Sequence, residues 1–364
     1  MTHPSDTTPF VALGIPIVCS DAHRLHEPGG EVWVGVRTPA VEVPARAERI
    51  RAAVAAAGAT AVNADTHPDE VALRFHDPAM VAWLREAWER WQRSGLTEDP
   101  GQDRVVPYLS PHPGLLGPLP APTPVAPAAL AGRWCFDTMT LIGPGSWEAA
   151  RAAVDAALTA GDLVAAGEPA AYALCRPPGH HATRDAYGGS CYLNNAAAAA
   201  GLLRDRLDDP VALLDIDAHH GNGAQSIFWT DPHVATGSVH VDPGAGWFPH
   251  FLGFAGEVGG GEAAGSNLNL PLAPGSDDGP WLEAVAELCD FARGAGARGL
   301  VVALGVDAAT ADPESPLAVT AAGYRAAGEL LGALGLPTVV VQEGGYDLDA
   351  IGELVVATLE GIDR

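Results

Sequence analysis

The sequence predicts an α/β fold with a single domain, in which a mostly parallel central sheet is covered by helices on both faces. Two observations lead to this prediction. Short apolar or β-branched runs alternate along the chain with alanine-rich stretches, and this alternation is typical of helix-covered sheets. The runs are also apolar throughout rather than at every second position, as expected for strands buried on both faces of a parallel sheet.

The expected elements can be placed in chain order. The apolar run Val11–Cys19 is read as a first buried strand, because no basic segment precedes it and no small-residue cleavage motif follows it. Further strands are expected at Ala170–Cys175, Val211–Ile216, Val234–Val241, Gly299–Val306 and Pro337–Val341. Helices are expected at Trp147–Ala166, Asn195–Leu207, Gly279–Gly294, Thr320–Leu334 and Leu348–Leu359. Ser146 and Thr320 provide candidate start signals for two of these helices.

The segment 94–144 differs from the rest of the chain. It is rich in proline and glycine and has no clear helical or strand periodicity. Long segments of this kind inside a compact domain are usually functional or act as linkers. Because regular elements on both sides belong to one expected sheet, we interpret 94–144 as a surface excursion of a single domain spanning residues 1–364.

Composition and charge exclude several classes of function. Aspartate and glutamate number 45 against 20 basic residues, all of them arginine, and the formal net charge is -25. Without lysine, Schiff-base catalysis, a P-loop and a Ser-x-x-Lys dyad are impossible. The negative charge argues against nucleic acid as a partner and favours a cationic substrate. No apolar run reaches the roughly 18 residues of a membrane span, and five cysteines without a C-x-x-C pair predict a reduced, cytoplasmic chain.

Polar side chains follow five of the expected strands. The segments concerned are, in order, Arg176–His181, Asp215–Gly223, His240, Asp307 and Gln342–Tyr346. Ligands of open α/β sheets bind outside the carboxyl ends of the strands. The sequence therefore predicts one active site at this edge of the sheet.

The residue types at these strand ends suit a metal. Asp217 and His219 are two positions apart, so on an extended backbone they project from the same face. With Asp307 they offer three nitrogen and oxygen ligands, and three protein ligands with an open position are typical of catalytic zinc. The alternative, solvated turn residues, stays open for Asp307 alone. It suits D-x-D-x-H-H-G-x-G poorly, because burying such a run is unfavourable unless it is paired or bound to a metal.

Two further polar groups are candidate catalysts. His180 and His181 follow a Pro-Pro-Gly turn. Adjacent loop histidines are often surface residues, but Asp215 and Asn222 could orient them, and a histidine held in this way is a tuned general base. Tyr346 follows two glycines and is either a partly buried anchor or a hydrogen-bond donor to an oxyanion.

Four motifs in this order, R-P-P-G-H-H-A, L-D-I-D-A-H-H-G-N-G, G-V-D-A…D-P and E-G-G-Y, resemble the zinc-dependent histone deacetylase superfamily, whose fold is arginase/deacetylase-like. The resemblance runs from about Asp137 to Asp347, with looser agreement at Glu42-x-Pro44-x-Arg46. Within the superfamily, F-D-T-x-T-x-I-G-P-G-S-W (136–147) and Y-G-G-x-C-Y-L-N-N (187–195) are most similar to bacterial acetylpolyamine amidohydrolases, followed by class II histone deacetylase-like amidohydrolases.

The resemblance implies one catalytic zinc ion. Its ligands would be Asp217, His219 and Asp307, and the zinc would polarise an amide carbonyl and lower the pKa of a water molecule. The resemblance also implies a structural potassium or sodium ion near Asp215, Ser238 and the backbone around His219.

The reaction implied is hydrolysis of an N-acetyl amide. His180 and His181 correspond to tandem catalytic histidines whose outer partners are Asp215 and Asn222. We expect His181 to take the proton from water and one histidine of the pair to protonate the leaving amine. Tyr346 would donate a hydrogen bond to the tetrahedral oxyanion.

The resemblance also implies substrate contacts. Asp137 corresponds to an acidic residue that grips the substrate backbone or amine. Beside Gly189, Ser190 replaces a Phe or Tyr of the substrate tunnel, which leaves room for a bulkier acyl group or a different amine. The excursion 94–144 matches a loop that builds a dimer and narrows the entrance, so a homodimer is expected.

The expected function is removal of acetyl or related acyl groups from acetylated polyamines or similar small cationic amines. Acetyl-lysine in peptides is the alternative substrate. A binuclear-manganese ureohydrolase needs further carboxylates where Gly221 and Ala309 stand. A non-catalytic acetyl-amine binder predicts loss of a ligand or the tyrosine, and neither is lost. A thiol hydrolase would use Cys191, which is more readily explained as a small buried apolar residue.

Overall fold

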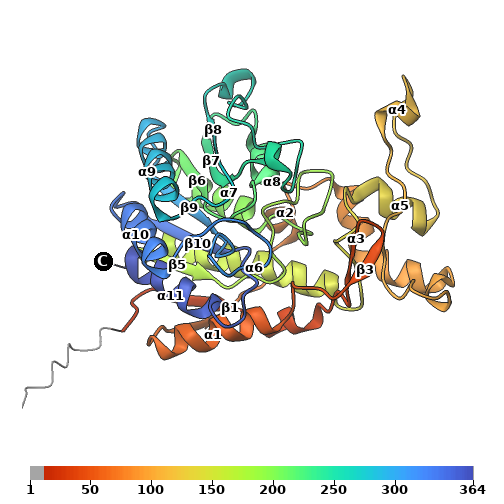
Figure 1. Ribbon diagram of the computed structural model, residues 1–364, viewed down its shortest axis with the longest axis horizontal. Helices are drawn as coiled ribbons and strands as arrows, with labels where there is room; N and C mark the ends of the chain where they lie inside the picture. Colours follow the sequence, from red (N-terminus) through yellow and green to blue (C-terminus); the bar gives the residue numbers. More distant parts are fainter. Residues whose placement is uncertain (1–11, 364) are drawn as a thin grey trace, which may run out of the picture.

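A parallel sheet lies at the centre of the computed structural model, which describes residues 12–363 (Figure 1). Within these residues the sheet has eight strands in the order β4-β1-β5-β10-β9-β6-β7-β8, and every neighbouring pair is parallel. The strands are β1 (Ile17–Cys19), β4 (Ala61–Asn63), β5 (Ala170–Ala173), β6 (Val211–Asp215), β7 (Val234–Val241), β8 (Asn267–Leu272), β9 (Gly299–Leu304) and β10 (Thr338–Gln342). The predicted fold class is confirmed.

The central strands are apolar throughout because both faces of the sheet are covered. On β9, Leu300 and Val302 pack into the core on one face, whereas Val301 and Ala303 pack into the core on the other. The expected first strand is shorter than predicted, since β1 begins at Ile17. Val11 lies outside the described residues.

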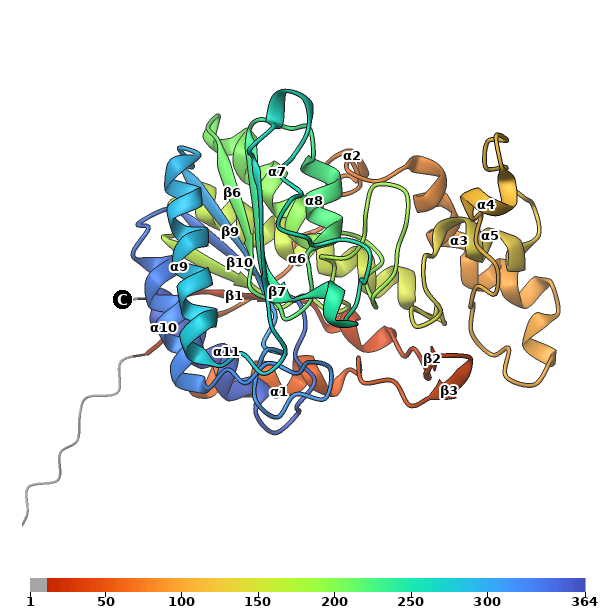
Figure 2. The same ribbon diagram turned by 45° about the horizontal axis from the view of Figure 1, so that its top comes forward.

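Two layers of helices cover the sheet (Figure 2). One face carries α1 (Ala45–Ala56), α9 (Asp278–Gly294), α10 (Ala321–Gly332) and α11 (Ile351–Ile362). The opposite face carries α6 (Ser146–Ala165), α7 (Asn195–Leu207) and α8 (Asn222–Phe228). Thr320 caps α10 as expected, because its side chain accepts from Gly323 N at 3.2 Å. Ser146 does not cap α6: its hydroxyl lies 2.9 Å from His26 Nδ1, and the helix begins at Ser146 itself.

The excursion 94–144 projects away from the sheet (Figures 1 and 2). Although the sequence shows no clear periodicity here, the segment contains η2 (Leu96–Glu98), α4 (Pro113–Leu116) and α5 (Pro127–Trp134). It packs against α3 (Pro78–Arg93), and the two helices α3 and α5 share a buried apolar cluster that includes Trp91 and Trp134. Short helices interrupted by proline leave little periodic signal, which explains why the sequence did not predict them.

The remaining regular elements are small. They are the antiparallel hairpin β2 (Glu31–Trp33) and β3 (Val36–Thr38), the helix α2 (Asp69–Ala72), and the 3-10 turns η1 (Asp21–Leu25), η3 (Pro243–Ala245) and η4 (Gly261–Ala263). Across residues 12–363, none of the helices combines the length and apolarity that a membrane crossing requires. All five cysteines are free and buried.

The strand order brings the polar strand ends together. The strands β5, β10, β9, β6 and β7 are consecutive neighbours and run in the same direction. Their carboxyl ends therefore share one edge, as the sequence predicts.

Candidate active site

Three of the predicted residues converge at this edge. Asp217 and His219 follow β6 and Asp307 follows β9, and one ligand atom from each lies within 4.8 Å of the others. The Nδ1 atom of His219 lies 3.2 Å from Asp217 Oδ1 and 3.1 Å from Asp307 Oδ2. The structure thus assembles the three candidate ligands from two neighbouring strands.

Backbone N–H groups fix both carboxylates. Asp217 accepts from His219 N and Gly344 N, each at 2.8 Å, and Asp307 accepts from Ala218 N at 2.8 Å. Gly344 must be a glycine because a Cβ atom there would lie 2.3 Å from Asp307 Oδ2 and 2.5 Å from Asp217 Oδ2. The second residue of E-G-G-Y is therefore explained by close approach of the backbone to the two carboxylates.

The chemistry of this group fits a divalent cation. Both carboxylates are fully buried; burial and then the charge of Asp217 raise the pKa of Asp307 to about 7. Burial opposes protonation of His219, but the two carboxylates hold the pKa of its ring well above the usual value. Two anionic oxygens and an imidazole nitrogen that face one another match the donor set of a catalytic zinc site.

The tandem histidines lie beside this group with the expected partners. His180 Nδ1 is 2.8 Å from Asp215 Oδ2, and His181 Nδ1 is 2.6 Å from Asn222 Oδ1. The two imidazole rings are 4.0 Å apart between centroids. A carboxylate thus holds one histidine and a neutral amide holds the other.

These partners give the two histidines different proton affinities. Burial disfavours the charged form of His180, but the carboxylates of Asp217 and Asp215 raise its pKa to about 10. Burial and the neighbouring rings of His180 and His219 keep the pKa of His181 well below its usual value. The pair is therefore polarised toward a charged His180 and a neutral His181.

Gly189 and Ser190 form a tight turn against His181. Both have positive φ, 58° and 61°, as at the centre of a two-residue hairpin turn. Glycine is needed at the first position because a Cβ there would lie 2.3 Å from His181 Cδ2. Ser190 lines the cavity described below.

Asp137 is placed differently from the other predicted substrate contacts. Its carboxylate accepts from Gly189 N at 2.5 Å and from Met139 N and Thr140 N at 3.0 Å. Asp137 therefore holds the Gly189-Ser190 turn against its own loop. It borders an apolar groove next to the cavity rather than the cavity itself.

Tyr346 is supported by Arg46, the last residue of the Glu42-x-Pro44-x-Arg46 motif. The buried Arg46 guanidinium lies 4.6 Å from the centre of the Tyr346 ring and donates to Gly345 O at 2.5 Å and Glu343 O at 2.6 Å. Glu42 accepts from Arg46 at 2.9 Å. The Glu42-x-Pro44-x-Arg46 motif by itself does not indicate this role in the sequence.

A cavity of about 210 Å³ opens above these groups. His181, His219 and Tyr346 contribute to its lining, whereas His180 does not. Its wall also contains the apolar side chains of Trp33, Val41, Met139, Trp247 and Phe248. The site can thus hold a small, partly apolar molecule against two histidines and a tyrosine.

Two acidic side chains in the cavity wall were not predicted. Glu31 is 9% exposed and accepts from Val41 N at 3.1 Å. Burial, helped by the charge of Glu314, raises the pKa of Glu31 to about 7. No pattern in the sequence indicates Glu31, which lies in a three-residue strand. Glu314 directly follows Asp312-Pro313, the D-P pair of the G-V-D-A…D-P motif.

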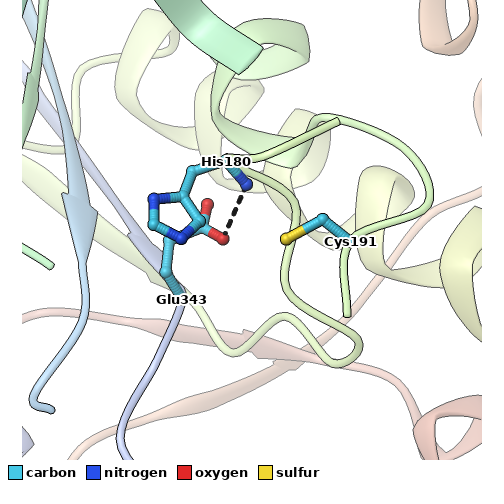
Figure 3. A group of neighbouring side chains, drawn as sticks. All are labelled: His180, Cys191 and Glu343. Carbon is cyan, nitrogen blue, oxygen red and sulfur yellow. Dashed lines mark hydrogen bonds between the residues drawn. The ribbon is translucent and has the colours of Figure 1, made fainter. Parts of the chain in front are cut away.

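Behind the histidines lies a second buried cluster, His180, Cys191 and Glu343 (Figure 3). Glu343 Oε2 accepts from Gly179 N at 2.6 Å and His180 N at 3.0 Å, and the Cys191 thiol points toward the same carboxylate. Burial holds the pKa of that thiol well above its usual value, which disfavours the thiolate that a thiol hydrolase requires. Within this cluster, Glu343 is the hydrogen-bonded support of the histidine loop.

Comparisons with known proteins identify relatives of this chain. The histone deacetylase domain pattern matches residues 40–362. Acetylpolyamine amidohydrolase of Mycoplana ramosa is 39% identical over 350 residues, 95% of this chain and 99% of that protein. Acetylpolyamine amidohydrolase 1 of Pseudomonas aeruginosa is 40% identical over 347 residues, 95% and 98% of the two chains. The crystal structure of acetylpolyamine aminohydrolase from Burkholderia pseudomallei superposes with a TM-score of 0.90 at 37% identity, and the match covers 96% of this chain and 98% of that chain.

Substitution of Gly344 tests the assembly of the carboxylates. We expect Gly344→Ala to lower the affinity for zinc at least tenfold, because the added methyl group would displace both candidate carboxylate ligands. Competition with a chromophoric chelator measures this affinity. Gly294→Ala is the control, since a Cβ atom at Gly294 meets nothing within 4 Å. Unchanged zinc affinity of Gly344→Ala would contradict the assigned ligands.

Proposed function

The chain belongs to the histone deacetylase domain family, and we propose that it removes acetyl groups from acetylated polyamines or similar small cationic amines with one zinc ion. The observation that carries this proposal is a single cavity in which His219, His181 and Tyr346 meet the acidic wall residues Glu31 and Glu314. The relatives named above as acetylpolyamine amidohydrolases support the same substrate class.

Asp217, His219 and Asp307 are the proposed zinc ligands. When bound, zinc supplies Lewis-acid polarisation of the amide carbonyl and a lowered pKa of water. Their ligand atoms lie within 4.8 Å of one another, close enough to share one metal ion. A metal pair would need ligands at Gly221 and Ala309, which have no side-chain donor.

The proton transfers are assigned to the two histidines. His181 donates its Nδ1–H to Asn222 and therefore presents the lone pair of Nε2, so it is the proposed base that takes the proton from water. It also lines the cavity. Asp215 holds His180 in its protonated form. One histidine of this pair is the proposed donor of the proton that the leaving amine receives.

Tyr346 is the proposed donor to the oxyanion. It lines the cavity, and Arg46 fixes its ring from behind. Burial keeps the pKa of the phenol well above its usual value, although Arg46 opposes this shift. The hydroxyl therefore retains its proton and can donate it in a hydrogen bond as negative charge develops on the carbonyl oxygen.

The acidic wall is the proposed site for a substrate ammonium group. Glu31 and Glu314 line the same cavity as Tyr346, and the whole chain carries a net charge of -25, which raises the local concentration of cations. Ser190 contributes a small polar side chain to the lining of this cavity. This supports the prediction that the tunnel accepts an amine other than a simple lysine chain.

We also propose a homodimer formed through the excursion 94–144. Large apolar side chains there are exposed, among them Tyr108, Leu109, Leu115, Leu119 and Val125, and such patches favour association. A cytoplasmic location fits the five free, buried cysteines. The structural potassium or sodium ion near Asp215 stays a prediction, and in the structure the Ser238 hydroxyl lies 2.8 Å from His240 Nδ1.

A side-by-side turnover assay tests the substrate class. With zinc bound, we expect kcat/KM for acetylputrescine and acetylspermidine to exceed that for an acetyl-lysine peptide at least tenfold. The reason is that only the acetylated polyamines carry a free ammonium group at the end of the chain that can reach the acidic wall. Prior treatment with a chelator should abolish all turnover, and added zinc should restore it. A higher kcat/KM for the peptide would instead support the alternative protein deacetylase function.

The phenol is tested by Tyr346→Phe. We expect kcat to fall about 10²–10³-fold, as for loss of one oxyanion donor. Bound zinc, measured by elemental analysis, should stay at one per chain, because Tyr346 is not a proposed ligand. Full activity of this variant would refute the oxyanion assignment.

The acidic wall predicts a pH dependence of substrate binding. Burial, followed by the charges of Glu314 and Glu42, raises the pKa of Glu31 to about 7, so the negative charge of its carboxylate is lost as pH falls through this value. We expect KM for acetylputrescine to rise up to about tenfold between about pH 8 and about pH 6. N-butylacetamide, which lacks the ammonium group, should show no such rise, and Glu31→Gln should remove it for acetylputrescine. An equal rise for both substrates would contradict this role of Glu31.

A further inference from the structure

The D-P pair of the third motif, Asp312-Pro313, has no role in the mechanism above, yet its aspartate is buried next to the site. Asp312 is 7% exposed and lies on the segment that follows β9. Its Oδ2 atom accepts from Tyr346 N at 2.7 Å and from Asp347 N at 3.2 Å. Its Oδ1 atom accepts from Glu314 N at 3.0 Å.

One carboxylate thus joins two segments that line the cavity. One segment carries Glu314 on the acidic wall, and the other carries the phenol of Tyr346. The two oxygens of Asp312 divide between them, since Oδ2 binds the tyrosine segment and Oδ1 binds the wall segment. A planar carboxylate has a fixed separation between its oxygens, so the two backbone segments are held at a fixed spacing.

This spacing matters because the proposed function assigns the two segments to different parts of the substrate. The Tyr346 phenol is assigned to the amide, and the Glu314 carboxylate is assigned to the free ammonium group. An acetylated diamine can engage both only if its chain length matches the distance between them. A misplacement of about 1 Å can reduce turnover about 10²-fold.

We propose that Asp312 is a positioning residue that couples the Tyr346 phenol to the Glu314 carboxylate and thereby sets the preferred chain length of the acetylated diamine. This inference rests on the proposed function, because it assigns Tyr346 to the oxyanion and Glu314 to the amine. It adds a residue that touches neither the amide nor the ammonium group and acts through the backbone N–H groups of the residues that do.

Asparagine is the informative replacement. Asp312→Asn keeps nearly the same size but has one acceptor oxygen, and its amide NH₂ group must face a backbone N–H donor. It can therefore satisfy the tyrosine segment or the wall segment, but not both. Asp77→Asn is the matched control: Asp77 also caps backbone, accepting from Ala79 N at 2.7 Å at the start of α3, away from the cavity.

The test combines a double-mutant cycle with a chain-length series. We expect Asp312→Asn to lower kcat for acetylputrescine about 10–100-fold, and to lower it less than about twofold in a Tyr346→Phe background, because residues that act as a unit are non-additive. The variant should also flatten the kcat/KM preference among monoacetylated diamines of three, four and five carbons. Asp77→Asn should match the unsubstituted chain in both measurements.

Bound zinc and the melting temperature are measured for every variant. Zinc at one per chain with a normal melting transition supports a positioning role, whereas loss of zinc from Asp312→Asn would overturn it in favour of a general structural role. If Asp312→Asn fails to fold, Asp312→Ser, whose hydroxyl also cannot serve both segments, carries the same test.

Two kinetic outcomes are decisive. Fully additive losses in the double variant, or an unchanged chain-length preference in Asp312→Asn, would overturn the coupling while leaving the proposed function intact. Full activity of Tyr346→Phe alone would instead contradict the proposed oxyanion assignment and remove the basis of the inference with it.

Discussion

Repulsion between two buried carboxylates is the constraint around which this site is organised. Asp217 and Asp307 are fully buried and approach the same imidazole nitrogen within 3.2 and 3.1 Å. Such a pair is stable only if cationic or hydrogen-bonding groups surround it. The backbone N–H groups of Gly344 and Ala218 meet part of this requirement, and a divalent cation would meet the rest. The parallel sheet matters because it delivers both carboxylates and their donors to one edge.

A second group of buried charged side chains keeps the loops of the candidate site in place. Arg46 lies against Tyr346 and binds backbone carbonyl groups of the preceding residues, while Glu42 balances its charge. Glu343 holds the backbone of the histidine loop in the same way. These groups replace water as hydrogen-bonding partners of loops that would otherwise be free to move, so the reactive side chains are preorganised.

The sequence alone could predict the parts of the site that depend on strand ends. Asp217, His219 and Asp307 follow apolar runs, and parallel strands of one sheet must bring such residues to a common edge. Glu31 could not be predicted in this way, because it reaches the cavity from a short hairpin whose place depends on tertiary packing. The excursion shows the same limit: α5 is only eight residues long, and its burial is decided by contact with α3 rather than by its own pattern.

The strand order has a consequence for how the protein folds during its synthesis. β10 is the last strand made during synthesis among the described residues, yet it lies between β5 and β9 in the middle of the sheet. Without β10, the groups β4-β1-β5 and β9-β6-β7-β8 have no strand that joins them, and each would have an unpaired inner edge. The proposed metal ligands belong to one half, the tandem histidines follow the other, and Tyr346 arrives with the strand that joins them. In a nascent chain the proposed catalytic centre is therefore incomplete, and we expect hydrolysis to begin only when the sheet closes.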